Sequence, residues 1–197
     1  AIGFDVGVFT KSQNLLGKTS FKAELSGRGF SLNAIKAKMD GNISSLDLNG
    51  YTYKNIDVDG KKKKKLFNGA LTIAEENLGL DFKGTINLSG KIPVYDFTTN
   101  ITDAYLTKLN LINRDSTSKL TTEADIRVTG RDINEMTGYI RIGKTEYREV
   151  NDTIKLDSIS FTAYSEGDKK RSKFRSDIID FDMFGTYKRS LLYSDIS

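Results

Sequence analysis

Histidine, cysteine and tryptophan are all missing from the 197 residues of this chain. Without imidazole and thiol groups, the sequence excludes histidine-based catalytic triads, cysteine nucleophiles, disulfide bonds and the common zinc and haem ligand sets. A nucleophile could come only from Ser, Thr, Lys, Tyr or a carboxylate, with no imidazole base to activate it. We therefore expect no enzymatic activity, no metal and no cofactor.

Proline is nearly absent as well, since Pro93 is the one example. Because proline removes a backbone donor from a β-ladder, its scarcity favours long, uninterrupted sheet. Leu, Ile, Val and Phe together account for 53 of the 197 residues, above the level of roughly 20% below which disorder becomes common. The chain can therefore bury a core, but not a large one.

The excess of positive charge comes from a single run of lysines. The 30 basic and 26 acidic residues give a net charge of +4, and the remainder is −1 without the run Lys61, Lys62, Lys63, Lys64 and Lys65. A nucleic-acid-binding surface spreads its basic residues over a face, among aromatic residues, so we expect no nucleic-acid partner. No apolar stretch approaches the 18 residues of a membrane-spanning helix. Ala1 opens within the alternating pattern without a signal peptide, so we expect a segment of a longer protein.

A short motif recurs along the chain, in which two apolar residues alternate with other residues and a glycine follows in phase. Its eight copies end at Gly27, Gly41, Gly50, Gly60, Gly84, Gly90, Gly130 and Gly185. Alternation with a period of two is typical of a strand with one buried face. A glycine in such a position indicates a turn, a bulge or a tight bend. We predict an all-β fold, a strongly curved and mostly antiparallel sheet that forms one continuous system of strands.

The same alternation predicts which side chains share the apolar face. These candidates are Leu46, Leu48, Ile56, Val58, Leu71, Ile73, Leu78, Leu80, Phe82, Ile86, Leu88, Ile126, Val128, Ile140, Ile142 and Phe161. The face is either the closed core of a sandwich or the lining of an open groove that holds an acyl chain or a partner strand. Composition does not separate these two interpretations.

Loops are expected at 59–65, 75–77, 113–119 and 166–172, and short helices at 104–111 and 188–196, although 104–111 also fits a strand. The lysine run lies in the first of these loops. We interpret it as a solvated hairpin tip or a charge that blocks edge pairing. The alternative is a contact for anionic lipid headgroups.

Two sets of carboxylates resemble sites but have a simpler explanation. Asp57 and Asp59 match the first half of a calcium loop, yet the twelfth position is Leu66 and lysines fill the gap. Asp180 and Asp182 alternate with apolar residues, as strand carboxylates that face solvent do. We predict neither a metal site nor a catalytic pair of carboxylates.

The order of landmarks along the chain is similar to that of a known family. The landmarks are GRGF at 27–30, LNGYTYKNIDVDG at 48–60, LFNGALTI at 66–73, NLGLDFKGTINL at 77–88 and IPVYDFTTNITDAYLTKLNL at 92–111. RDINEMTGYIRI at 131–142 and SDIIDFDMFGTYKRSLL at 176–192 look like the family's closing strands. The chain thus resembles the repeat of TamB-like proteins of the AsmA-like superfamily, most of all the form found in the Bacteroidetes. The lysine run is unusual for the corresponding loop of that family.

The resemblance implies a β-taco, a half-pipe of curved sheet with an apolar inner face. It also implies a periplasmic location, within a longer protein anchored in the inner membrane. The implied function is a non-enzymatic conduit or scaffold that carries phospholipid acyl chains between the membranes in outer-membrane biogenesis. The implied partner is an outer-membrane barrel protein of the Omp85 class, bound through parts outside this chain.

Two other functions remain open at this point. One is a chaperone-like binder that offers sheet edges to nascent outer-membrane strands by β-augmentation, and the other is a purely structural β-repeat. Within the single segment 1–197, we expect 1–40 to end a preceding repeat, 41–112 to form a full repeat and 113–197 to supply the following strands.

Overall fold

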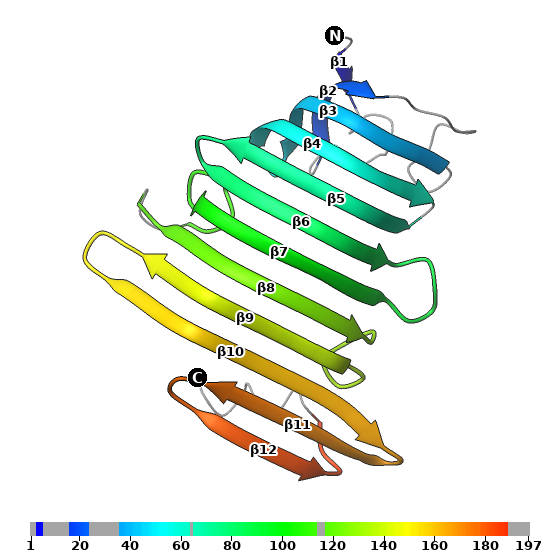
Figure 1. Ribbon diagram of the computed structural model, residues 1–197, viewed down its shortest axis with the longest axis vertical. Helices are drawn as coiled ribbons and strands as arrows, with labels where there is room; N and C mark the ends of the chain where they lie inside the picture. The colour runs from blue at the N-terminus through cyan, green and yellow to red at the C-terminus, as the bar shows by residue number, and fades with distance from the viewer. Residues whose placement is uncertain (1–2, 6–15, 24–35, 64, 114–116, 189–197) are drawn as a thin grey trace.

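The computed structural model describes residues 3–5, 16–23, 36–63, 65–113 and 117–188. Within these ranges it describes the side chains from residue 41 onward, except those of Lys62 and Lys63. Twelve strands follow one another in sequence order across one sheet (Figure 1). They are β1 (Gly3–Asp5), β2 (Leu16–Ala23), β3 (Lys36–Leu48), β4 (Tyr51–Lys63), β5 (Leu66–Glu75), β6 (Leu78–Asn87), β7 (Val94–Tyr105), β8 (Lys119–Thr129), β9 (Thr137–Arg148), β10 (Thr153–Glu166), β11 (Lys169–Ser176) and β12 (Asp180–Gly185).

The sheet is antiparallel throughout, open and curved, which confirms the all-β prediction. Each described strand makes extensive contact only with its neighbours in the sheet, so no second sheet covers either face within the described residues. The same residues contain no helix with the length and apolarity needed to cross a membrane.

Register aligns one residue from each of nine strands into a row on the apolar face, which we call the central row. Its successive members are Gly60, Gly69, Gly84, Phe97, Ile126, Ile140, Phe161, Phe174 and Phe181. Side chains alternate between the faces, so a register slip of one residue would turn an entire strand's apolar set to the other side. The row shows that the apolar face continues from β4 to β12.

Glycines in the central row allow aromatic rings to lie over the backbone. A Cβ at Gly69 would lie 2.3 Å from the Asp59 carbonyl oxygen, and a Cβ at Gly60 would lie 3.0 Å from the Phe67 ring. The Phe67 and Phe82 rings have centroids 5.9 Å apart, and those of Phe82 and Phe97 are 4.9 Å apart. These glycines therefore lie in mid-strand and provide close packing, not turns.

The hairpin between β3 and β4 follows from its sequence. Asn49 and Gly50 have φ values of +53° and +74°, which is the geometry of the two-residue turn that Asn-Gly favours. Further along β4, Asn55 is also left-handed, with φ of +52°. Lys54 and Asn55 are both exposed there, whereas Tyr53 and Ile56 on either side are buried on the apolar face. The left-handed residue thus lets the apolar pattern change its phase without leaving the sheet.

Three of the local expectations are wrong. Residues 59–65 form no long loop, because β4 continues to Lys63 and pairs with β3 and β5 as far as that residue. Residues 166–172 are mostly strand, with a tight turn at Gly167 and Asp168. Residues 104–111 form neither the helix nor the full strand that the pattern allowed, because β7 ends at Tyr105 and irregular turns follow. Most of the other expected helix, at 188–196, lies outside the described residues.

Candidate functional site: an apolar groove

The first half of the sheet curves around an apolar groove with a volume of about 870 Å³. This volume lies in the range of small-molecule sites. Eleven of the predicted apolar residues line the groove, namely Leu46, Leu48, Ile56, Val58, Leu71, Ile73, Leu78, Leu80, Phe82, Ile86 and Leu88. Ile43, Tyr53, Lys65, Leu66 and Phe67 complete the lining.

The other five predicted residues lie on the same face but outside this groove. Ile126, Ile140 and Phe161 belong to the central row. Val128 pairs with Tyr95, and Ile142 pairs with Ala124 and Ile159, in the rows beside it. All five are partly exposed, so the apolar face stays accessible across β8, β9 and β10. That any of the sixteen residues contacts lipid remains a prediction.

One end of the groove is closed by residues 106–113, which we call the end segment. The Leu109 side chain is fully buried and packs with Tyr53, Ile56 and Leu78 in the main apolar cluster. The backbone turns on itself, since the Leu109 amide donates to the Tyr105 carbonyl at 3.0 Å. The end segment therefore covers the strand ends where β3 meets β4.

A pair of asparagines ties the end segment to the β3–β4 turn. The Asn49 side-chain amide donates to the Asn110 carbonyl at 2.8 Å, and the Asn110 amide donates back to the Asn49 carbonyl at 3.3 Å. Nearby, the Tyr51 hydroxyl donates to a Glu75 carboxylate oxygen at 2.8 Å. Burial raises the pKa of Tyr51 and that of Tyr53. Side chains at this end of the groove are deeply buried, with Tyr53 at 8% and Leu78 at 7% exposure.

The opposite end of the groove is open. Lys65 and Leu88 lie there, just beyond the ends of β4 and β6, and the Leu88 amide donates to the Lys65 carbonyl at 2.8 Å. Leu88 is 42% exposed, whereas Leu78 at the other end of β6 is 7% exposed. Along β6 and its C-terminal extension, the lining therefore becomes more exposed from Leu78 to Leu88.

The structure separates the lysines of the run. Lys61 pairs across the strands with Asn68 and lies on the polar face, where it is exposed. Lys65 is exposed too, but it lines the apolar groove. Lys62 and Lys63 belong to β4 with undescribed side chains, and Lys64 lies outside the described residues. Of the two predicted headgroup contacts whose side chains are described, Lys65 lies at the groove and Lys61 does not.

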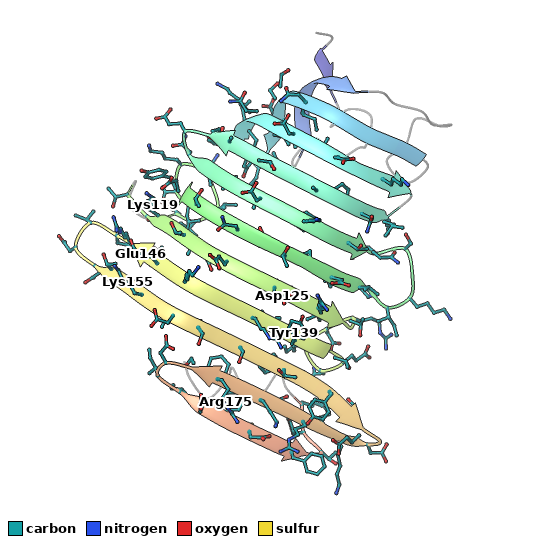
Figure 2. The ribbon with its side chains drawn as sticks, viewed as in Figure 1. Lys119, Asp125, Tyr139, Glu146, Lys155 and Arg175 are labelled. Atoms are coloured by element: carbon teal, nitrogen blue, oxygen red, sulfur yellow. The ribbon has the colours of Figure 1, made fainter. Side chains whose placement is uncertain are left out.

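Carboxylates and cations neutralise one another across the polar face. Figure 2 shows Asp125 and Tyr139 on neighbouring strands, where the Tyr139 hydroxyl donates to Asp125 at 3.0 Å and burial raises the pKa of Tyr139. At the strand ends, the hydrogen bond from Lys155 lowers the pKa of Glu146 (Figure 2). Arg171 donates two hydrogen bonds of 2.9 Å to Asp182 and lowers the pKa of that carboxyl to about 2. These carboxylates serve as ion-pair partners.

No cluster of metal-ligating side chains occurs within the described part of the chain. Asp57 accepts a hydrogen bond of 3.0 Å from Asn42 and faces away from the groove, as the next strand's Thr72 does.

A second hollow, of about 770 Å³, lies over the middle of the sheet and is lined partly by Lys83, Asp125 and Arg141.

Several groove residues were missed by the sequence analysis. Tyr53 precedes the phase change at Asn55, so it falls outside the glycine-ended motif. Phe67 is the second residue after the lysine run, next to the segment 59–65 for which the sequence predicts a loop. Tyr95, Phe97 and Ile101 alternate with polar residues, and this signal could have extended the predicted face to β7.

Comparison with known proteins finds no family model, no curated protein and no solved structure that matches this chain.

Proposed function

We propose that this chain is a non-enzymatic lipid-carrying segment that holds phospholipid acyl chains against the apolar face of its sheet and passes them along it. The single observation that carries the proposal is the continuity of that face. The groove over β3–β6 leads into the central row, which runs through Phe97, Ile140 and Phe161 to Phe181.

The partial exposure of this face favours an open groove, and not the closed core of a sandwich. Leu71, Leu80 and Phe82 are all only partly buried, in a sheet that has no opposing layer within the described residues. Contiguous apolar surface beyond a few hundred Å² is uncommon on a free monomer and usually marks a binding site. Acyl chains match this surface because they are apolar, as most of the side chains that line the groove are.

The wider setting belongs to the same proposal. The resemblance to TamB-like proteins suggests a periplasmic location between two membranes, within a longer protein anchored in the inner one. An outer-membrane partner of the Omp85 class would bind outside this chain. Under this proposal the ion pairs of the polar face, such as Arg171 with Asp182, keep that face hydrated.

Two measurements test the proposal. Mass spectrometry of organic extracts should find phospholipid on the purified chain. A fluorescent phospholipid should move from donor to acceptor vesicles faster in its presence. Bound lipid without faster transfer would favour a static scaffold. Absence of both would remove the lipid function and favour a β-augmentation binder or a structural repeat.

A further inference from the structure

The two ends of the apolar groove differ in both exposure and charge. At one end, the end segment buries Leu109 against Tyr53 and Leu78. At the other, Leu88 is exposed beside the cationic side chain of Lys65. No ion pair among the described residues uses the Lys65 ammonium group. A closed apolar end and an open cationic end match a molecule with an apolar tail and an anionic head.

The dimensions of the groove also match one acyl chain. From Phe67 to Ile73 on β5 the lining spans six residue steps, or about 20 Å at the rise of a β-strand. One leaflet of a bilayer is about 15 Å of hydrocarbon, half of the roughly 30 Å core. A single tail lying along the strands would therefore fit between the end segment and Lys65.

The geometry points to an anionic phospholipid as the occupant of this groove. One tail lies along β4–β6 with its end toward Leu78 and Tyr53. The phosphate lies at the Lys65 ammonium group, and Leu88 and Leu66 contact the first carbons of the tail. This inference rests on the proposed function. It adds the class of lipid, the direction in which the lipid lies in the groove, and the residue that binds its headgroup.

The neighbouring lysine supplies a matched control. Lys61 and Lys65 belong to one run and are both exposed, but Lys61 lies on the polar face opposite Asn68. Lys65→Gln and Lys61→Gln therefore change the net charge equally and differ in position relative to the groove. The probe is an equimolar mixture of phosphatidylglycerol, which is anionic, and phosphatidylcholine, which is zwitterionic. Native mass spectrometry measures how much of each lipid the 197-residue chain retains.

We expect the native chain to prefer phosphatidylglycerol. Lys65→Gln should lower the ratio of the two bound lipids by about five-fold, the factor expected for one basic residue near an anionic lipid surface. Lys61→Gln should leave the ratio within about two-fold. Unchanged melting temperatures in both variants would show that the fold is intact.

Other outcomes separate the two proposals. Equal retention of both lipids by the native chain, or equal effects of the two substitutions, would overturn recognition of the head by Lys65 while leaving lipid binding in place. Retention of neither lipid by the native chain would overturn the lipid function itself, and this inference with it.

Discussion

At Gly69 there is no room for a side chain, because the neighbouring strand approaches too closely. A Cβ there would lie 2.3 Å from the Asp59 carbonyl oxygen and 2.4 Å from the Gly60 Cα. At Gly143, also within a strand, the nearest atom would be the Asp157 carbonyl oxygen at 3.8 Å. Both positions are glycines of the same sheet, so they form a natural comparison.

We expect Gly69→Ala to destabilise the chain by about 1–3 kcal/mol, as overpacked sites do, and Gly143→Ala to change stability by less than about 0.5 kcal/mol. Chemical denaturation followed by circular dichroism measures both values. Equal stabilities for the two variants would show that β4 and β5 can move apart at no cost, contrary to the packing described.

Single residues also explain where sequence reasoning succeeded and where it stopped. Gly60 and Gly84 were predicted in phase with the apolar face, and register places both in the central row. The phase change at Asn55 was not predicted, because a left-handed residue inside a strand leaves no mark in an alternating pattern except two consecutive polar residues. Tyr53 was missed for this reason, although it is buried in the main apolar cluster.

The end segment shows the same contrast at the level of an element. Leu106 and Leu109 have a helix-like spacing, but the backbone forms irregular turns with local hydrogen bonds, and further contacts join these turns to residues such as Ser118. One of these contacts links Asn110 to Asn49, which lies 61 positions earlier in the chain. Local sequence does not contain such a partner, so the sequence could predict apolar residues here but not the closed end of the groove.

The stability of the end segment depends on one buried side chain. Leu109 is fully buried, whereas Leu111, two residues later, is 55% exposed. We expect Leu109→Ala to cost about 2–5 kcal/mol, as buried Leu→Ala changes do, and Leu111→Ala to change stability by less than about 0.5 kcal/mol. Thermal and chemical unfolding of the two variants measures this difference.

Hydrogen exchange adds a local readout to the same pair of variants. If the end segment closes the groove, Leu109→Ala should speed exchange of the amides of Leu106 and Leu109, which donate to Ser118 and Tyr105. Exchange that stays as slow as in the native chain would contradict the role of Leu109 in holding this segment.

At the scale of the whole molecule, the sheet divides polar and apolar side chains largely between its two faces, although the exposed ring of Phe184 lies on the polar side opposite Arg171. The polar face carries cross-strand charges, such as Arg127 between Asp96 and Asp125, and the apolar face carries the central row. Alternation along each strand predicted this division from sequence, and antiparallel pairing extends it across the sheet. Sequence alone left open whether the apolar face is covered, because that depends on which elements pack against it.

A charge placed in the groove separates an open face from a closed core. Leu80 lines the groove and is partly exposed, so in Leu80→Asp the carboxylate could reach water. We expect this variant to fold, with a loss of about 1–2 kcal/mol from the truncated apolar side chain, and to lose its bound phospholipid, because an acyl chain would have to pass a fixed charge. Thermal melting and lipid co-purification measure the two effects.

Thr98→Asp is the matched control for this experiment. Thr98 is exposed on the polar face and pairs with Lys83 on one side and Asp125 on the other, so a carboxylate there meets one cation and one anion and stays away from the groove. The control should fold and retain lipid at the native level. Collapse of Leu80→Asp alone would indicate a closed core, since burying an unpaired carboxylate costs several kcal/mol. A folded Leu80→Asp that keeps its full lipid content would remove this part of the face from the path of the acyl chain.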